Sequence, residues 1–234
     1  MSAIYHWLPR VLDARQALNI IELGAHHGQD TAALRMMFPR ARIWAFEPDP
    51  RNAHKLRRAP VASRGAAGGV FVVEAAVSDT DGTATFRLSS GSRPRGPEDP
   101  SPRGGSAEPW TYSSSLKEPV EHLRVVPWVK FGETAKVKTV RLDTFCAEQQ
   151  PPLRHVDFIW ADVQGAEDLF IAGAQDTLTR VRLLYTEFAE IEMYRGQLGL
   201  KGILERLPGR WEVVAKFDHD VLLKNLDAYS GMYL

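Results

Sequence analysis

The feature that most constrains the fold is an alternation of short apolar runs with segments of helical periodicity. The apolar runs are rich in β-branched residues, as are strands that are buried on both faces of a sheet. Strands separated by helices are typical of a mainly parallel sheet with helices on both faces. The runs fall at residues 17–23, 42–46, 70–77, 156–161 and 181–185, and helical spacing falls at 30–38, 55–58 and 166–178.

Weaker patterns extend this sheet. Residues 83–88 alternate between apolar and polar after the Asp81-Gly82 turn, which predicts a hairpin partner of the strand before it. Residues 137–142 predict a further strand. The runs at 211–217 and 221–224 predict an antiparallel pair at the edge of the sheet.

Residues 91–110 interrupt the alternation, because Pro, Gly and Ser replace the apolar side chains that a buried element needs. We predict a solvated loop or a lid over a site, since long loops in compact proteins are often functional. The whole chain, 1–234, is expected to form one domain with a flexible insertion at about residues 89–115.

The balance of charge limits the partners. The 29 Lys and Arg residues equal the 29 Asp and Glu residues, which argues against a dedicated nucleic-acid binder. The one cysteine, Cys146, cannot form an internal disulfide, so we expect a reducing, cytoplasmic location. No apolar run is long enough to predict a membrane span, and the first ten residues lack the order of a signal peptide.

A glycine turn follows the first predicted strand, where ligands of such sheets bind. Gly24 and Gly28 bracket Ala25, His26 and His27. Glycine lets the backbone turn tightly and approach a ligand. The middle glycine of the dinucleotide fingerprint is absent, so this turn alone is a weak signal.

Carboxylates follow three of the predicted strands. Glu47 ends the second, near the spacing at which an acid accepts hydrogen bonds from ribose hydroxyls, although it could instead pair with Arg51 or Lys55. Asp162 follows the apolar run 156–161, where a base, a cofactor contact or a helix cap would lie.

Glu187 ends the fifth predicted strand, so its carboxylate should lie beside that of Asp162. Two carboxylates are too few to predict a metal site; a divalent ion is compatible with the sequence but is not predicted. The aromatic residues Trp110, Trp128, Phe188 and Tyr194 are expected either to line an acceptor pocket or to pack in the core or on the surface.

At these positions the sequence resembles the FkbM family of S-adenosylmethionine-dependent methyltransferases, from Asn19 to Asn225. Two positions depart from the family pattern: His26 replaces an Asn, and Gln164 replaces a Glu. The motifs that carry the resemblance are Glu22-Leu23-Gly24-Ala25-His26-His27-Gly28-Gln29, Phe46-Glu47-Pro48, Ala76-Val77-Ser78-Asp79 with Gly82, Val140-Arg141-Leu142-Asp143 and Asp162-Val163-Gln164-Gly165-Ala166-Glu167.

The resemblance implies a class I Rossmann-like α/β fold with a seven-stranded, mainly parallel sheet of order 3-2-1-4-5-7-6. It also implies how the cofactor is held. Gly24, Ala25 and Gly28 would wrap the methionine part, and Glu22 and Thr31 would lie near its amino and carboxylate ends. Glu47 would hold the ribose, and Ala76 and Val77 would border the adenine. His26, Pro48 and Asp162 complete the predicted cofactor site.

The resemblance implies methyl transfer from S-adenosylmethionine to a hydroxyl of a small molecule, sugar or natural product. We expect Asp162 to orient the acceptor or accept its proton, with Glu187 as the second catalytic residue. Two alternatives stay open: an NAD-dependent oxidoreductase, which the missing middle glycine disfavours, and a non-catalytic binding protein of the same fold. Neutral charge argues against a nucleic-acid acceptor.

Overall fold

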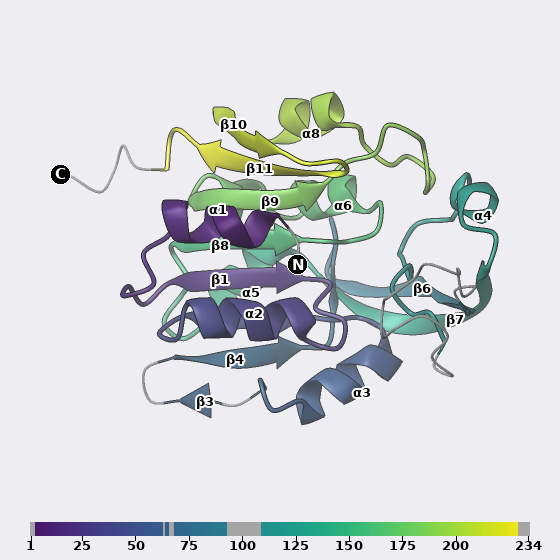
Figure 1. The fold of residues 1–234 in the computed structure, drawn as a ribbon, viewed down its shortest axis with the longest axis horizontal. Helices are drawn as coiled ribbons and strands as arrows, with labels where there is room; N and C mark the ends of the chain where they lie inside the picture. Colours follow the sequence, from purple (N-terminus) through teal and green to yellow (C-terminus); the bar gives the residue numbers. More distant parts are fainter. Residues whose placement is uncertain (1–2, 63, 66–67, 93–108, 229–234) are drawn as a thin grey trace.

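The computed structural model describes residues 3–62, 64–65, 68–92 and 109–228. These residues form a large sheet, a smaller second sheet and helices on both faces of the large sheet (Figure 1). The strands of the large sheet are β1 (Asn19–Leu23), β2 (Arg42–Phe46), β3 (Arg64–Gly65), β4 (Gly68–Val73), β8 (Val156–Ala161), β9 (Val181–Glu187), β10 (Trp211–Lys216) and β11 (Asp220–Asn225).

The order of the large sheet is β10-β11-β9-β8-β1-β2-β4-β3. The central strand β1 pairs in parallel with β2 and β8, and the parallel set continues to β4 and β9. The pair β10 and β11 is antiparallel and forms one edge, as predicted. Without the two-residue strand β3, the strands taken in chain order follow 3-2-1-4-5-7-6. The mainly parallel α/β sheet is thus confirmed, and β3 is an eighth strand that the sequence did not predict.

Two apolar cores cover the two faces of this sheet, because successive strand residues point to opposite sides. On one face Ile20 packs with Leu8 and Leu34, and on the other Ile21 packs with Phe170 and Ile203. The first core is covered by α1 (Ile4–Val11), α2 (Gln29–Met37) and α3 (Pro50–Arg58), and the second by α5 (Leu142–Glu148), α6 (Glu167–Ala172), α7 (Gln175–Leu178) and α8 (Leu200–Arg206).

Helices α1, α5 and α8 were not predicted, and α5 begins inside the strand expected at 137–142. The helix expected at 166–178 is broken into α6 and α7 at Gly173. A Cβ on Gly173 would lie 1.9 Å from the carbonyl oxygen of Ser78, so the backbone at Gly173 lies directly against the backbone at Ser78. No helix in the described ranges is long and apolar enough to cross a bilayer.

The second sheet corrects two strand predictions. It contains β5 (Ala76–Val77), β6 (Gly82–Gly91) and β7 (Val129–Val140) in the order β5-β7-β6. The predicted strand 70–77 is two strands, because the chain turns at Ala75, whose N–H donates to the carbonyl of Val73 (3.0 Å). The partner of β6 is β7 rather than the strand before it, so the predicted hairpin is wrong.

The second sheet lies at the end of the large sheet toward which the parallel strands point, together with α4 (His122–Val125) (Figure 1). It therefore faces the edge at which the functional residues were expected. The predicted loop at 91–110 and insertion at 89–115 fall largely on residues 93–108, which lie outside the described residues.

Candidate active site

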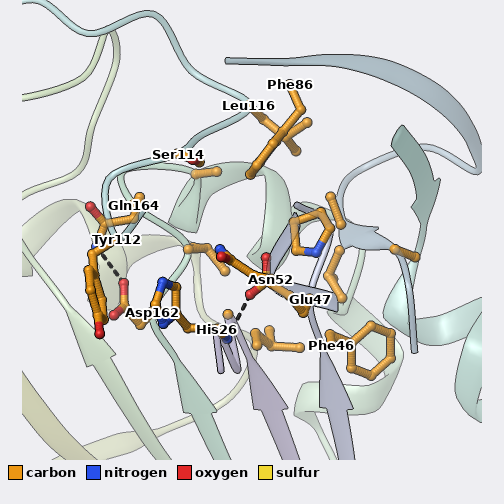
Figure 2. Close-up of a pocket in the computed structure, with 18 of the residues that line it drawn as sticks. His26, Phe46, Glu47, Asn52, Phe86, Tyr112, Ser114, Leu116, Asp162 and Gln164 are labelled. Carbon is orange, nitrogen blue, oxygen red and sulfur yellow. Dashed lines mark hydrogen bonds between the residues drawn. The ribbon is translucent and has the colours of Figure 1, made fainter. Parts of the chain in front are cut away.

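A cavity opens at the carboxyl ends of β1, β2 and β8, between the large sheet and the second sheet (Figure 2). Seven of the predicted cofactor residues line it: Gly24, His26, Glu47, Pro48, Ala76, Val77 and Asp162. Five predicted residues lie outside its lining: Glu22, Ala25, Gly28, Thr31 and Glu187.

The glycine turn is shaped by packing as much as by the cavity. Gly24 has a φ of +87°, and a Cβ there would lie 2.0 Å from the carbonyl oxygen of Asp162. Gly28 has a φ of +83° and is the N-cap residue of α2, and a Cβ there would lie 2.6 Å from Cδ1 of Leu56. Both positions therefore need glycine for left-handed backbone and close approach. The close approach at Gly28 is to Leu56 of α3, and Gly28 does not line the cavity.

His26 occupies a left-handed position, with φ of 51°. His and Asn are both enriched in this region among non-glycine residues, so the departure from the family's Asn keeps the same backbone. Its ring stacks on Tyr112 at 3.7 Å between centroids, and Nε2 lies 2.7 Å from the hydroxyl of Thr111.

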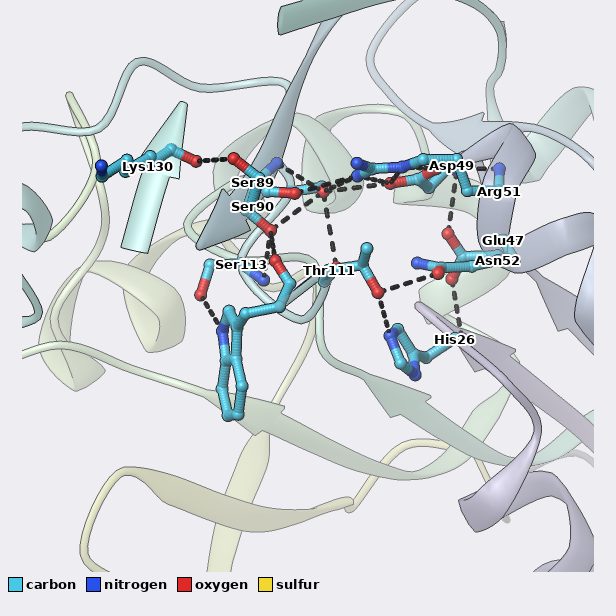
Figure 3. A network of polar contacts seen from close by, with 12 residues as sticks. His26, Glu47, Asp49, Arg51, Asn52, Ser89, Ser90, Thr111, Ser113 and Lys130 are labelled. Atoms are coloured by element: carbon cyan, nitrogen blue, oxygen red, sulfur yellow. Dashed lines mark hydrogen bonds and ion pairs between the residues drawn. The ribbon is translucent and has the colours of Figure 1, made fainter. Parts of the chain in front are cut away.

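Glu47 is held at the cavity by backbone donors (Figure 3). Oε2 accepts from the N–H of His26 (2.7 Å), and Oε1 accepts from the N–H of Asp49 (2.8 Å). Arg51 pairs instead with Asp49 (2.6 Å), so the alternative of a Glu47–Arg51 pair is not observed. The Glu47 side chain is buried, and burial raises its pKa to about 8.

Glu22 and Thr31 contact each other beneath the turn. The Thr31 hydroxyl donates to Glu22 Oε2 (2.6 Å), and both residues are buried. Burial raises the pKa of Glu22 to about 8. Glu22 comes from β1 and Thr31 from α2, and their hydrogen bond connects the two elements. Neither residue lines the cavity.

Asp162 and Glu187 lie side by side, as predicted. The Nε2 of Gln164 lies 2.6 Å from Asp162 Oδ1 and 3.3 Å from Glu187 Oε2. Burial raises the pKa of Asp162 to about 6, and burial followed by the charge of Asp162 raises that of Glu187 well above its usual range. A hydrogen bond between the two carboxyls lowers the pKa of Asp162 and raises that of Glu187. The hydrogen bond between the two carboxyls therefore favours the proton on Glu187 and the charge on Asp162.

Glu167, in the first turn of α6, is fully buried, although a first-turn acid is usually a solvated partner of the helix dipole. The N–H of Gly165 lies 3.4 Å from its Oε1. Burial raises the pKa of Glu167 to about 8. This carboxyl adds to the acidic surroundings of Asp162 and Glu187.

Sequence reasoning missed one wall of the cavity. Residues 109–117 run back across it and are fixed by side-chain contacts: Ser114 Oγ lies 3.1 Å from Asp49 Oδ2, and the Thr111 hydroxyl lies 2.9 Å from Asn52 Oδ1. A Pro/Ser-rich stretch gave no periodicity from which to predict this contact. The lining residues that were not predicted as site residues are Leu23, Phe46, Asn52, Ala75, Phe86, Thr111, Tyr112, Ser114, Leu116, Val163, Gln164 and Ala166.

The residues present fit an adenosyl cofactor. Gly24 leaves no side chain between the turn and the strand end of β8. A buried acid at the end of β2 faces the same cavity as Ala76, Val77 and Phe86, which offer an apolar wall for a base. The order of the sheet and the place of this site are those of the class I methyltransferase fold that the sequence resemblance implied.

Comparison with known proteins identifies the family. The model of the methyltransferase FkbM domain matches residues 22–228. A 2-O-methyltransferase, NoeI of Sinorhizobium fredii (strain NBRC 101917 / NGR234), is 38% identical over 210 residues, which cover 88% of this chain and 79% of that protein. The chain belongs to the FkbM methyltransferase family, and it is an S-adenosylmethionine-dependent methyltransferase. Neither the oxidoreductase nor the non-catalytic alternative is favoured.

Solved structures resemble the chain more distantly. A magnesium protoporphyrin IX methyltransferase (ChlM) from Synechocystis PCC 6803 is 9% identical with a TM-score of 0.48, covering 95% of this chain and 76% of that one. A fibrillarin from Aeropyrum pernix is 14% identical with a TM-score of 0.43, covering 91% and 67%. The family assignment rests on the sequence comparisons and not on these structures.

Proposed function

We propose that this methyltransferase methylates a hydroxyl oxygen of a small-molecule acceptor that binds beside Asp162. The observation that carries the proposal is a half-buried carboxylate at the wall of the cavity, which accepts a hydrogen bond from the amide of Gln164 (2.6 Å). A hydroxyl needs a proton acceptor when it becomes an ether, and Asp162 is positioned to be that acceptor.

The proposed cofactor contacts follow from the lining. Glu47 would accept hydrogen bonds from the ribose, because its carboxylate lines the cavity directly after β2. Ala76 and Val77 would contact the adenine, and Gly24, His26 and Pro48 the rest of the cofactor. Ala25 and Gly28 would act by shaping the turn, and Glu22 and Thr31 by supporting it from behind.

The chemistry divides between cofactor and protein. When bound, S-adenosylmethionine supplies a methyl group whose bonding electrons remain on sulfur as it is displaced. The protein holds the acceptor oxygen in line with that group and excludes water. Asp162 takes the proton that the acceptor oxygen loses, and Glu187 lies beside it as the second carboxyl of the pair.

Two observations support a hydroxyl-bearing small molecule as the acceptor. The name of NoeI, a 2-O-methyltransferase, refers to an oxygen acceptor, and the chain covers most of that relative. The formal net charge is zero, so the chain offers little overall attraction to a polyphosphate backbone. We also propose a cytoplasmic location, since the thiol of Cys146 is free and buried.

The test is a methyl-transfer assay with S-adenosylmethionine and a panel of sugars, polyols, phenols and short RNA oligonucleotides. We expect a mass increase of one methyl on a hydroxyl compound, lost in Asp162→Asn while S-adenosylhomocysteine still binds. Asp218→Asn, an exposed acid on the β10–β11 connection, is the matched control. Near-normal turnover in Asp162→Asn, or methylation of RNA alone, would refute the proposal.

A further inference from the structure

Gln164 has an unusual backbone for its residue type. Its φ is 51°, in the left-handed region, and Gly165 follows with a φ of +88°. A Cβ on Gly165 would lie 2.6 Å from the Cβ of Tyr194, so the turn lies directly against that residue. A left-handed backbone is unfavourable for glutamine, and such strain persists only where the surroundings enforce it.

The side chain of Gln164 joins three groups from different elements. Its Nε2 carries two hydrogens, and it lies 2.6 Å from Asp162 Oδ1 and 3.3 Å from Glu187 Oε2. Its Oε1 lies 3.1 Å from the hydroxyl of Tyr194, and its backbone carbonyl accepts from the Ser115 hydroxyl (2.7 Å). The residue also lines the cavity (Figure 2).

We propose that Gln164 is the positioning residue of this site, whose amide fixes Asp162 as the proton acceptor and Glu187 as the proton holder of the carboxyl pair. The inference rests on the proposed function, since it assigns roles within the same site. An amide nitrogen only donates, so it stabilises ionised oxygens on the side of the pair that it contacts most closely.

The charges around Asp162 make this donor important. The hydrogen bond with Glu187 from β9 favours the ionisation of Asp162, but burial and the charges of Asp220 from β11 and Asp30 from α2 oppose it. The amide of Gln164 acts in the opposite direction and lowers the pKa of Asp162. A glutamate at this position, as in the family pattern, would supply another carboxyl in place of the donor.

Tyr194 keeps the amide in the required orientation. With the Tyr194 hydroxyl near Oε1, the amide nitrogen faces the carboxyl pair. The same hydroxyl lies 2.8 Å from the carbonyl oxygen of Ser113, so its one hydrogen is shared between this carbonyl and Gln164 Oε1. A flipped amide would instead direct its oxygen at an ionised carboxylate.

The experiment is a pH titration of the carboxyl groups by ¹³C NMR on the full chain, without donor or acceptor. Asp162→Asn and Glu187→Gln assign the two signals in the wild-type protein. Gln164→Met keeps the length of the side chain and removes the donor. Gln149→Met, whose amide contacts only the carbonyl of Phe145 among the hydrogen bonds described, is the matched control.

We expect the pKa of Asp162 to rise by about one unit in Gln164→Met and to stay unchanged in Gln149→Met. Gln164→Glu should raise it at least as far. Tyr194→Phe, which leaves Gln164 in place, should raise it by a smaller amount, and it serves as the test if Gln164→Met does not fold. A pKa for Asp162 that is the same in all these variants would overturn the inference.

The titration tests the role of Gln164, and the methylation assay tests the proposed function, so the two proposals can be refuted independently. A protein that methylates hydroxyls but shows no shift in Gln164→Met would retain the proposed function and exclude the role of Gln164. A shift in Gln164→Met, together with methylation of RNA alone, would retain the role of Gln164 in the pair and exclude the proposed acceptor.

Discussion

Gly24 and Asp162 touch through their backbones at the point where β1 and β8 end. The N–H of Asp162 donates to the carbonyl of Leu23 (2.9 Å), and a Cβ on Gly24 would lie 2.0 Å from the carbonyl oxygen of Asp162. The turn proposed to bind the cofactor and the carboxylate proposed to accept the proton are therefore one packed unit. A change on either side should affect both.

Gly24→Ala should destabilise the protein by about 3 kcal/mol or more, because the new Cβ meets backbone and the φ of +87° is unfavourable for alanine. Gly132→Ala is the control, since nothing lies within 4 Å of a Cβ there. Urea unfolding followed by circular dichroism measures both. Equal stability of the two variants would show that the contact is not as tight as described.

Glu167 should make the protein less stable as pH rises. Its pKa is about 8 in the folded state and near 4.5 when unfolded, so the folded state binds more protons between these values. The stability contributed by the protonated form is lost as pH rises through this window.

Glu167→Gln should remove that loss, by up to about 1.4 kcal/mol per pH unit relative to wild type. Denaturant unfolding at several pH values between 5 and 8 measures the difference. Glu212→Gln, at an exposed position of β10, is the control and should follow the wild-type curve. Parallel curves for wild type and Glu167→Gln would mean that Glu167 is ionised in the folded protein.

Tyr112→Ala should weaken binding of S-adenosylhomocysteine by about tenfold, because the ring that stacks on His26 at the cavity wall is removed. Tyr112→Phe keeps the ring and should bind like wild type. Calorimetric titration distinguishes these results. Equal affinity in all three proteins would place the cofactor away from the 109–117 wall.

Affinity for S-adenosylhomocysteine should rise with pH up to about 8 and then level off. The pKa of Glu47 is about 8 in the free protein, and hydroxyl donors favour the ionised carboxylate, so binding lowers this pKa and releases a proton. Calorimetry at pH 7 in two buffers of different ionisation enthalpy measures the proton. No proton release would contradict a ribose contact at Glu47.

The parallel sheet could be predicted from sequence because strands such as β2 and β8 are buried on both faces and read as continuous apolar runs. Shorter or less periodic elements could not. The second sheet was misread because a tight turn at Ala75 is not visible in a run of apolar residues. The partner of β6 comes from β7, beyond a long Pro-rich stretch, so no local pattern indicated it.

In the candidate site, too, some residues could be predicted from the sequence and others could not. Positions directly after strands, such as Glu47 and Asp162, could be predicted because topology alone brings them to one edge. Thr111 and Tyr112 could not, since they reach the cavity by side-chain contacts across the sequence. Glu22 lies behind the wall because its place in β1 directs it toward α2 and Thr31.

Glu47 provides the most direct test of the central claim, that the cavity at the strand ends binds the adenosyl cofactor. Calorimetric titration with S-adenosylhomocysteine at pH 8 should show one site in the wild-type protein. Glu47→Gln should weaken binding by about ten- to one-hundredfold, through loss of hydrogen bonds to a charged acceptor, and Glu212→Gln should not. Wild-type affinity in Glu47→Gln, or no binding by the wild-type protein, would contradict the account.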